Sequence, residues 1–175
     1  MKAPLFLLAL ATSAGLAYGQ SYIANLGPLL DGGGLRQGTG TVSVTLSGTT
    51  LTLSGSYSGI TSAMTGGHIH GPGNPGTNAP VIYDLIALGI LSGTTSGTYN
   101  GSFGLIANPT GYSSTAQQLV DFNAGSWYLN IHDSAFGGGE IRGQILPIPE
   151  PSTLSLVAVA TAGAGLAWRR RRARL

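Results

Sequence analysis

The feature that most limits the fold of this chain is a strict alternation of small polar and apolar residues in short runs. Residues 41–46 and 50–54 alternate in this way, and Ser47-Gly48-Thr49 between them has the composition of a hairpin turn. Because successive side chains of a strand point to opposite faces, a period of two gives each strand one apolar and one polar face. The pattern predicts antiparallel strands joined by tight turns.

Further runs with the composition of strands are separated by turns rich in glycine, proline and asparagine. These runs cover residues 21–26, 56–60, 67–70, 81–85, 97–104, 126–133 and 140–146. The one helix that we expect is short, over residues 114–122, with Ser114 as its N-cap. Many short strands without a long helix predict an all-β fold, an antiparallel sandwich or barrel.

The first residues have the order of a secretory signal peptide. Lys2 provides a positive start, residues 5–10 an apolar segment, and Ala17-Tyr18-Gly19 a cleavage pattern for signal peptidase. We therefore predict a signal peptide over residues 1–19 and a mature chain that starts at Gln20. The chain contains no cysteine, which excludes disulfides and a lipid anchor on cysteine.

The last residues combine a proline motif, an apolar run and an arginine cluster. Pro149, Glu150 and Pro151 precede an apolar run over residues 154–168, and the arginines follow it. This order predicts one short transmembrane helix with cytoplasmic arginines. Residues 148–175 resemble the PEP-CTERM sorting signal of Gram-negative bacteria. The resemblance implies transient anchoring in the inner membrane, cleavage by an exosortase, and release to the cell surface or extracellular matrix.

The net charge of the chain comes from its two ends. Between Gln20 and Pro151 the sequence has two cationic residues, Arg36 and Arg142, and six acidic ones, so that the net charge there is 2 − 6 = −4, against +2 for the whole chain. A mildly acidic, sparsely charged domain lacks the basic surface that binds nucleic acid. Nucleic acid is therefore excluded as a partner.

The three histidines are the residues best suited to metal chemistry. His68 and His70 are two positions apart in a predicted strand and share a face, and His132 lies on the polar face of another predicted strand. If the two strands pair, the imidazoles converge, and imidazole suits copper or zinc. A structural alternative stays open, in which the imidazoles bind loop carbonyls at the edge of the sheet.

Other patterns give no catalytic residue. Residues 71–76 match Gly-x-Gly-x-x-Gly, but the segment contains two prolines and no helix is expected after it. His132, Asp133 and Ser134 are contiguous and cannot converge as a triad on a strand. Glu140 and Arg142 share a face of a predicted strand, which predicts a structural ion pair, with Asp133 and Asp84 as alternative partners of the arginine.

Four segments of the chain resemble the CHRD (chordin-type) domain. They are residues 67–72, 81–85, 124–132 and 138–145, and the Gly-Glu-Ile-Arg-Gly-Gln run within the last is the most specific. The resemblance assigns residues 20–147 to one CHRD-like domain and implies an immunoglobulin-like or superoxide-dismutase-like β-sandwich. In animal chordins this domain belongs to a secreted binder of growth factors, and for bacterial members it implies an extracytoplasmic role.

Three classes of function stay open. The first is an exported, non-enzymatic binding or structural module, with an exopolysaccharide or a surface protein as partner. The second is an extracytoplasmic copper- or zinc-binding protein that uses His68, His70 and His132. An enzyme of unrecognised type, with metal-dependent redox activity as one form, has the least support. A copper/zinc superoxide dismutase needs more imidazoles than the three in this chain.

Overall fold

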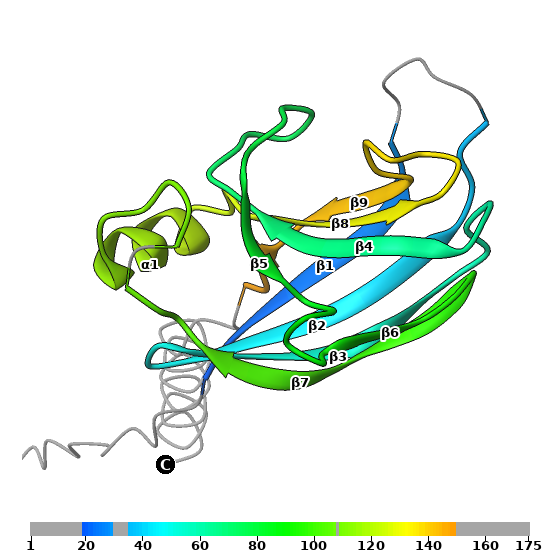
Figure 1. Ribbon diagram of the computed structural model, residues 1–175. Coiled ribbons are helices and arrows are strands. Elements are labelled where there is room, and N and C mark those ends of the chain that lie inside the picture. Colours follow the sequence, from blue (N-terminus) through cyan, green and yellow to red (C-terminus); the bar gives the residue numbers. More distant parts are fainter. Residues whose placement is uncertain (1–18, 30–34, 108, 150–175) are drawn as a thin grey trace, which may run out of the picture.

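The computed structural model describes residues 19–29, 35–107 and 109–149, which form one curled antiparallel sheet with a short helix at one end (Figure 1). The strands are β1 (Gln20–Pro28), β2 (Thr39–Ser47), β3 (Thr50–Ser58), β4 (Met64–His70), β5 (Val81–Asp84), β6 (Leu91–Gly93), β7 (Ser96–Gly104), β8 (Tyr128–Asp133), β9 (Ile141–Gln144) and β10 (Leu146–Pro147). Their order is β5-β4-β8-β9-β1-β2-β3-β7-β6, and β10 also pairs with β1.

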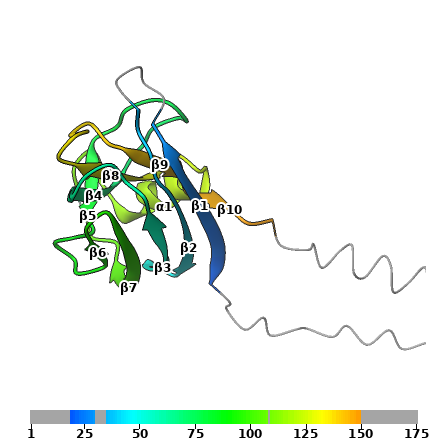
Figure 2. The ribbon, with the colours of Figure 1, turned by 90° about the vertical axis from the view of Figure 1, so that its right-hand side faces the viewer.

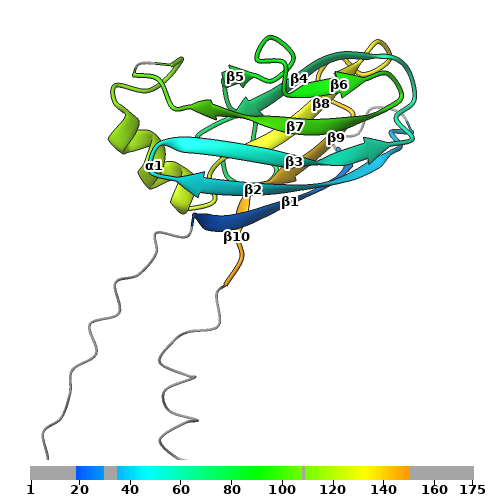
Figure 3. The same ribbon diagram turned by 90° about the horizontal axis from the view of Figure 1, so that it is seen from below.

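The sheet curls so that its two halves face each other across one core (Figures 1 and 3). One half contains β1, β2, β3, β7 and β6, and the other contains β9, β8, β4 and β5. Strand β1 joins the halves, because most of it pairs with β2 while Gly27 and Pro28 pair with Arg142 and Ile141 of β9. The all-β sandwich predicted from the sequence is confirmed.

Alternation places the apolar side chains of both halves in the core. In β8, Trp127 just before the strand, Leu129 and Ile131 are fully buried, as their spacing predicted. Strands β2 and β3 form the expected hairpin, with Ser47 opposite Thr50 and Gly48 at a φ of 60°. Strand β3 continues through Gly55 as one strand, where the sequence suggested two, and β6 was not predicted.

The helix α1 (Thr115–Asn123) covers one end of the sandwich (Figure 3). Ser114 caps it as predicted, because its hydroxyl oxygen accepts a hydrogen bond from Gln117 N at 3.2 Å. Phe122 of the helix packs against Trp127 and Tyr22, with ring centroids 5.2 and 4.4 Å apart. The helix therefore closes the aromatic end of the core.

Both ends of the domain lie on the same side, since Tyr22 of β1 pairs with Pro147 of β10 (Figure 2). The predicted signal peptide, apart from Gly19, and the segment from Glu150 onward, with the predicted transmembrane helix over 154–168, lie outside the described residues. Within the described ranges, no helix has the length and apolar character needed to cross a membrane.

The predicted ion pair between Glu140 and Arg142 is wrong. Glu140 lies in the bend before β9, fully buried, and its carboxylate accepts hydrogen bonds from Thr61 N and Gln37 N at 2.8 and 3.0 Å. Arg142 lies on the outer face of β9 and donates to Asn78 Oδ1 at 3.3 Å. The alternation that placed the two on one face does not apply, because Glu140 precedes the strand.

A second buried carboxylate lies beside Glu140. Asp133, 1% exposed, accepts hydrogen bonds from Ser62 N at 2.8 Å and Phe136 N at 2.6 Å. Burial by itself raises the pKa of Asp133, but the hydrogen bonds that its carboxylate accepts, those from Ser62 and Phe136 among them, outweigh burial and lower this pKa to about 2. The two carboxyl groups therefore attach the segment before β4 to the ends of β8 and β9, and neither pairs with Arg142.

We expect Glu140→Ala to lower the free energy of unfolding by about 3 kcal/mol, because the backbone N–H groups of Gln37 and Thr61 lose their buried acceptor. Urea unfolding followed by circular dichroism measures the change. Asp121→Ala is the matched control, since this half-buried carboxylate accepts one side-chain bond, from Gln117, and should cost less than about 1 kcal/mol. Equal losses in the two variants would contradict the anchoring role.

Candidate metal centre

The pairing of β4 with β8 brings the three histidines together. Gly66 lies opposite His132, His68 opposite Asn130, and His70 opposite Tyr128. The three imidazoles therefore lie on the outer face of this half of the sheet, while Ile69 between the first two histidines faces the core with no exposed surface. The convergence that the sequence analysis made conditional on strand pairing is present; metal binding itself stays a prediction.

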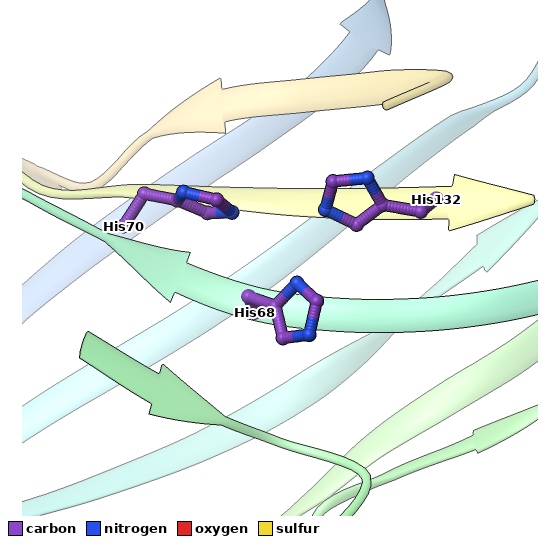
Figure 4. Close-up of side chains that lie close together, drawn as sticks. All are labelled: His68, His70 and His132. Carbon is purple, nitrogen blue, oxygen red and sulfur yellow. The ribbon is translucent and has the colours of Figure 1, made fainter. Parts of the chain in front are cut away.

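The rings face one another across a small space (Figure 4). One ring nitrogen from each histidine can be chosen so that all three lie within 4.8 Å of one another. Metal–nitrogen bonds of 2.0–2.1 Å in a tetrahedral site separate two ligand nitrogens by about 3.3 Å, so each separation needs to shorten by at most about 1.5 Å. Small side-chain rotations would bring the three nitrogens to the spacing of metal ligands.

Loop carbonyls orient two of the rings. His70 Nδ1 lies 2.9 Å from the carbonyl oxygen of Ala79, and His132 Nδ1 lies 2.9 Å from that of Gly137. Because a carbonyl oxygen only accepts, each Nδ1 carries the proton and each Nε2 keeps an unprotonated lone pair. A metal-bound imidazole typically has this arrangement, with its second nitrogen donating to a carbonyl.

Two ring nitrogens that face the centre are buried and lack a hydrogen-bond partner within the described ranges. They are His68 Nδ1 and His70 Nε2. A buried acceptor without a partner costs free energy, about 1–3 kcal/mol for each group. A cation between the rings would satisfy both nitrogens at once.

The environment favours the neutral form of two of the imidazoles, those of His68 and His70. Burial lowers the pKa of His70 to about 4, and the charges of His132, His68 and Arg142 act in the same direction, whereas the hydrogen bond to Ala79 opposes the shift. Burial also lowers the pKa of His68, as does the charge of His132, while Asp84 opposes the shift. Near neutral pH, protons therefore compete weakly for these two rings, and their lone pairs are available to a metal.

Residues that the sequence analysis did not assign to the site form its walls. The ring of Tyr128 stacks on His70 with centroids 4.9 Å apart and planes at 5°, and the guanidinium of Arg142 lies 3.6 Å from the Tyr128 ring centre. Gly66 leaves room for the rings, since a Cβ there would lie 3.0 Å from His68 Cε1. Tyr128 and Asn130 alternate with His132 along β8, and the spacing alone placed them on the same face of the strand as this histidine.

Two family comparisons agree with this description, whereas no curated protein and no solved structure matches the chain. Residues 147–172 match the PEP-CTERM protein-sorting motif, which marks an exported protein that is targeted to the cell surface and processed by an exosortase. Residues 31–145 match the CHRD domain and cover well over half of the chain, including all three histidines and the strands that carry them. The chain therefore belongs to the CHRD domain family.

Proposed function

We propose that this protein is a non-enzymatic surface or matrix module that binds copper or zinc through His68, His70 and His132. The observation that carries the proposal is the approach of three ring nitrogens to within 4.8 Å on one face of the sheet. Three imidazoles are a ligand set that suits both metals. Its sorting motif supports a location outside the cytoplasm, where the site would meet metal ions of the surroundings.

The structural alternative explains only part of the geometry. His70 and His132 do bind loop carbonyls, as that alternative requires, but each uses only Nδ1 to do so. The Nδ1 atom of His68 is buried and makes no hydrogen bond within the described residues. A purely structural cluster would leave this cost without compensation, whereas a bound metal removes it. Orientation by carbonyls is then part of the metal site.

Either of two partners, an exopolysaccharide or a surface protein, would suit a module released to the cell surface. The outer faces of β2, β3 and β7 favour the polysaccharide, because they present exposed hydroxyl groups on three adjacent strands and no charged residue. Six of these positions are Thr41, Ser43, Thr45, Thr52, Ser54 and Thr98. Such a face can exchange hydrogen bonds with sugar hydroxyls without desolvating charges.

We expect each purified chain to bind one Cu(II) or Zn(II) ion. A triple variant in which His68, His70 and His132 are replaced by Ala should bind none. Isothermal titration calorimetry measures the stoichiometry, and metal analysis after dialysis measures what is retained. Each single alanine variant should weaken binding by at least about 100-fold, because one of three ligands is lost.

Thr52→Ala, on the outer face of the other half of the sheet, is the control and should bind as the wild type does. Binding that survives in the triple variant would disprove the site. A wild type that binds neither metal, with a triple variant of lower stability, would establish the structural alternative instead.

We expect the zinc affinity of the protein to fall less between pH 7 and pH 5.5 than that of an unstructured peptide with three histidines. Three histidines with an ordinary pKa of 6.5 in an unstructured peptide should bind about 600-fold less tightly at pH 5.5 than at pH 7, because each becomes protonated. The pKa of His70 is lowered to about 4 and that of His68 is also lowered, so these two ligands stay largely neutral over this range. The protein should lose less than about 50-fold in affinity.

Competition titrations at the two pH values, with such a peptide as the control, measure this difference. Equal losses of affinity in protein and peptide would show that the rings are not held neutral by burial.

We expect the protein to cosediment with insoluble exopolysaccharide isolated from the matrix of a Gram-negative bacterium. Replacing Thr45, Thr52 and Ser54 together by Lys should weaken this association. The long lysine side chains would cover the hydroxyl face, and their charged amino groups would have to lose water on contact with the polysaccharide. A triple lysine variant at exposed positions of the helix, Ala116, Gln117 and Val120, is the matched control. Equal binding by both variants would exclude the hydroxyl face as the contact.

A further inference from the structure

We propose that Asn130 supplies the fourth ligand of the metal site through its side-chain oxygen Oδ1. The inference rests on the proposed metal binding by the three histidines and adds the residue that completes it. Asn130 carries no signal of its own in the sequence, because an asparagine on the polar face of a strand is ordinary. Its position and its hydrogen bonds single it out.

Asn130 lies in the middle of the site. It is two residues before His132 on β8 and directly opposite His68 of β4, so its side chain belongs to the face that carries the imidazoles. It is only 3% exposed. Within the described ranges, no further histidine, cysteine, aspartate or glutamate joins the three histidines. The remaining coordination position is therefore filled by a neutral side chain or by a molecule from solvent.

The amide of Asn130 already contacts a metal-binding atom. Its Nδ2 lies 3.4 Å from His132 Nε2, the unprotonated nitrogen of that ring. This separation is close to the distance of about 3.3 Å between two ligands of a tetrahedral metal. In the metal-free site the amide donates to His132, and Oδ1 is buried without a partner within the described residues.

Metal binding would reverse the preferred orientation of the Asn130 side-chain amide. Once the lone pair of His132 Nε2 is bound to a cation, Nδ2 has lost its acceptor and points its hydrogens toward positive charge. Rotation of the amide by about 180° exchanges Nδ2 and Oδ1, which have nearly the same size. The rotation gives up one long hydrogen bond, from Nδ2 to the Gly138 carbonyl at 3.5 Å, and turns the unpartnered oxygen toward the metal.

Gly139 prevents the amide from withdrawing. A Cβ atom at position 139 would overlap the Asn130 amide, and the φ of Gly139 is +118°, a conformation that favours glycine. The chain therefore lies directly behind the amide and holds it against His132. Four protein ligands make a closed site, which is typical of metals that are held rather than used for reaction. This closure agrees with the non-enzymatic role proposed above.

Azide binding to the Cu(II)-loaded full-length chain tests the closure, because azide on copper gives a strong charge-transfer absorption. We expect the wild type to show no azide band. Asn130→Leu, of similar size but without a ligand atom, should bind copper about 10- to 100-fold more weakly and develop the azide band. Asn130→Asp should bind copper at least about 10-fold more tightly and show no azide band, because a carboxylate is the stronger oxygen ligand.

Gln144→Leu is the matched control, since this neighbouring amide donates to the carbonyl oxygens of Gly73 and Gly125 and not to a histidine. It should bind copper as tightly as the wild type does and should likewise show no azide band. Azide binding by the wild type, with unchanged copper affinity in Asn130→Leu, would overturn the role of Asn130 while leaving the three-histidine site intact. Absence of copper binding in every variant would instead overturn the metal site itself.

Discussion

The antiparallel pairing of β4 with β8 is the interaction on which the rest of the structure depends. Its register places Ile69 opposite Leu129 toward the core and His68 opposite Asn130 on the outer face. Because side chains alternate along a strand, a slip by one residue would turn the imidazoles into the core and the apolar side chains outward. The free energy of core burial therefore also maintains the geometry of the histidine cluster.

The outer face of this half of the sandwich differs from an ordinary solvated sheet face. Tyr128 and Asn130 are almost fully buried there, under loops that also provide the carbonyls bound by His70 and His132. The same loops shield His70 from water and set the tautomers of His70 and His132. Burial and orientation thus have one physical cause, and both would favour the metal binding that we propose.

The domain has few charged residues, and Asp133, Glu140 and Arg142 mainly fix loops by hydrogen bonds. Asp133 and Glu140 are buried at one end of the sandwich, where backbone N–H groups of Ser62 and Thr61 satisfy them. Arg142 lies against Tyr128 on the outer face and donates to Asn78. Because buried carboxylates can be satisfied by backbone donors, the sparse cations of the domain are not needed to neutralise them.

Alternation by itself determined most of the strands, the core face of β8 and the shared face of His68 and His70, because a period of two is local and survives in any β-fold. The Ser114 cap was also readable, since a cap depends only on neighbouring residues. Only the tertiary structure decided that His132 meets the other two histidines and that Asn130 lies among them. It also decided that Glu140 turns inward, away from Arg142. These contacts depend on strand register and loop closure between distant parts of the chain, which no local pattern encodes.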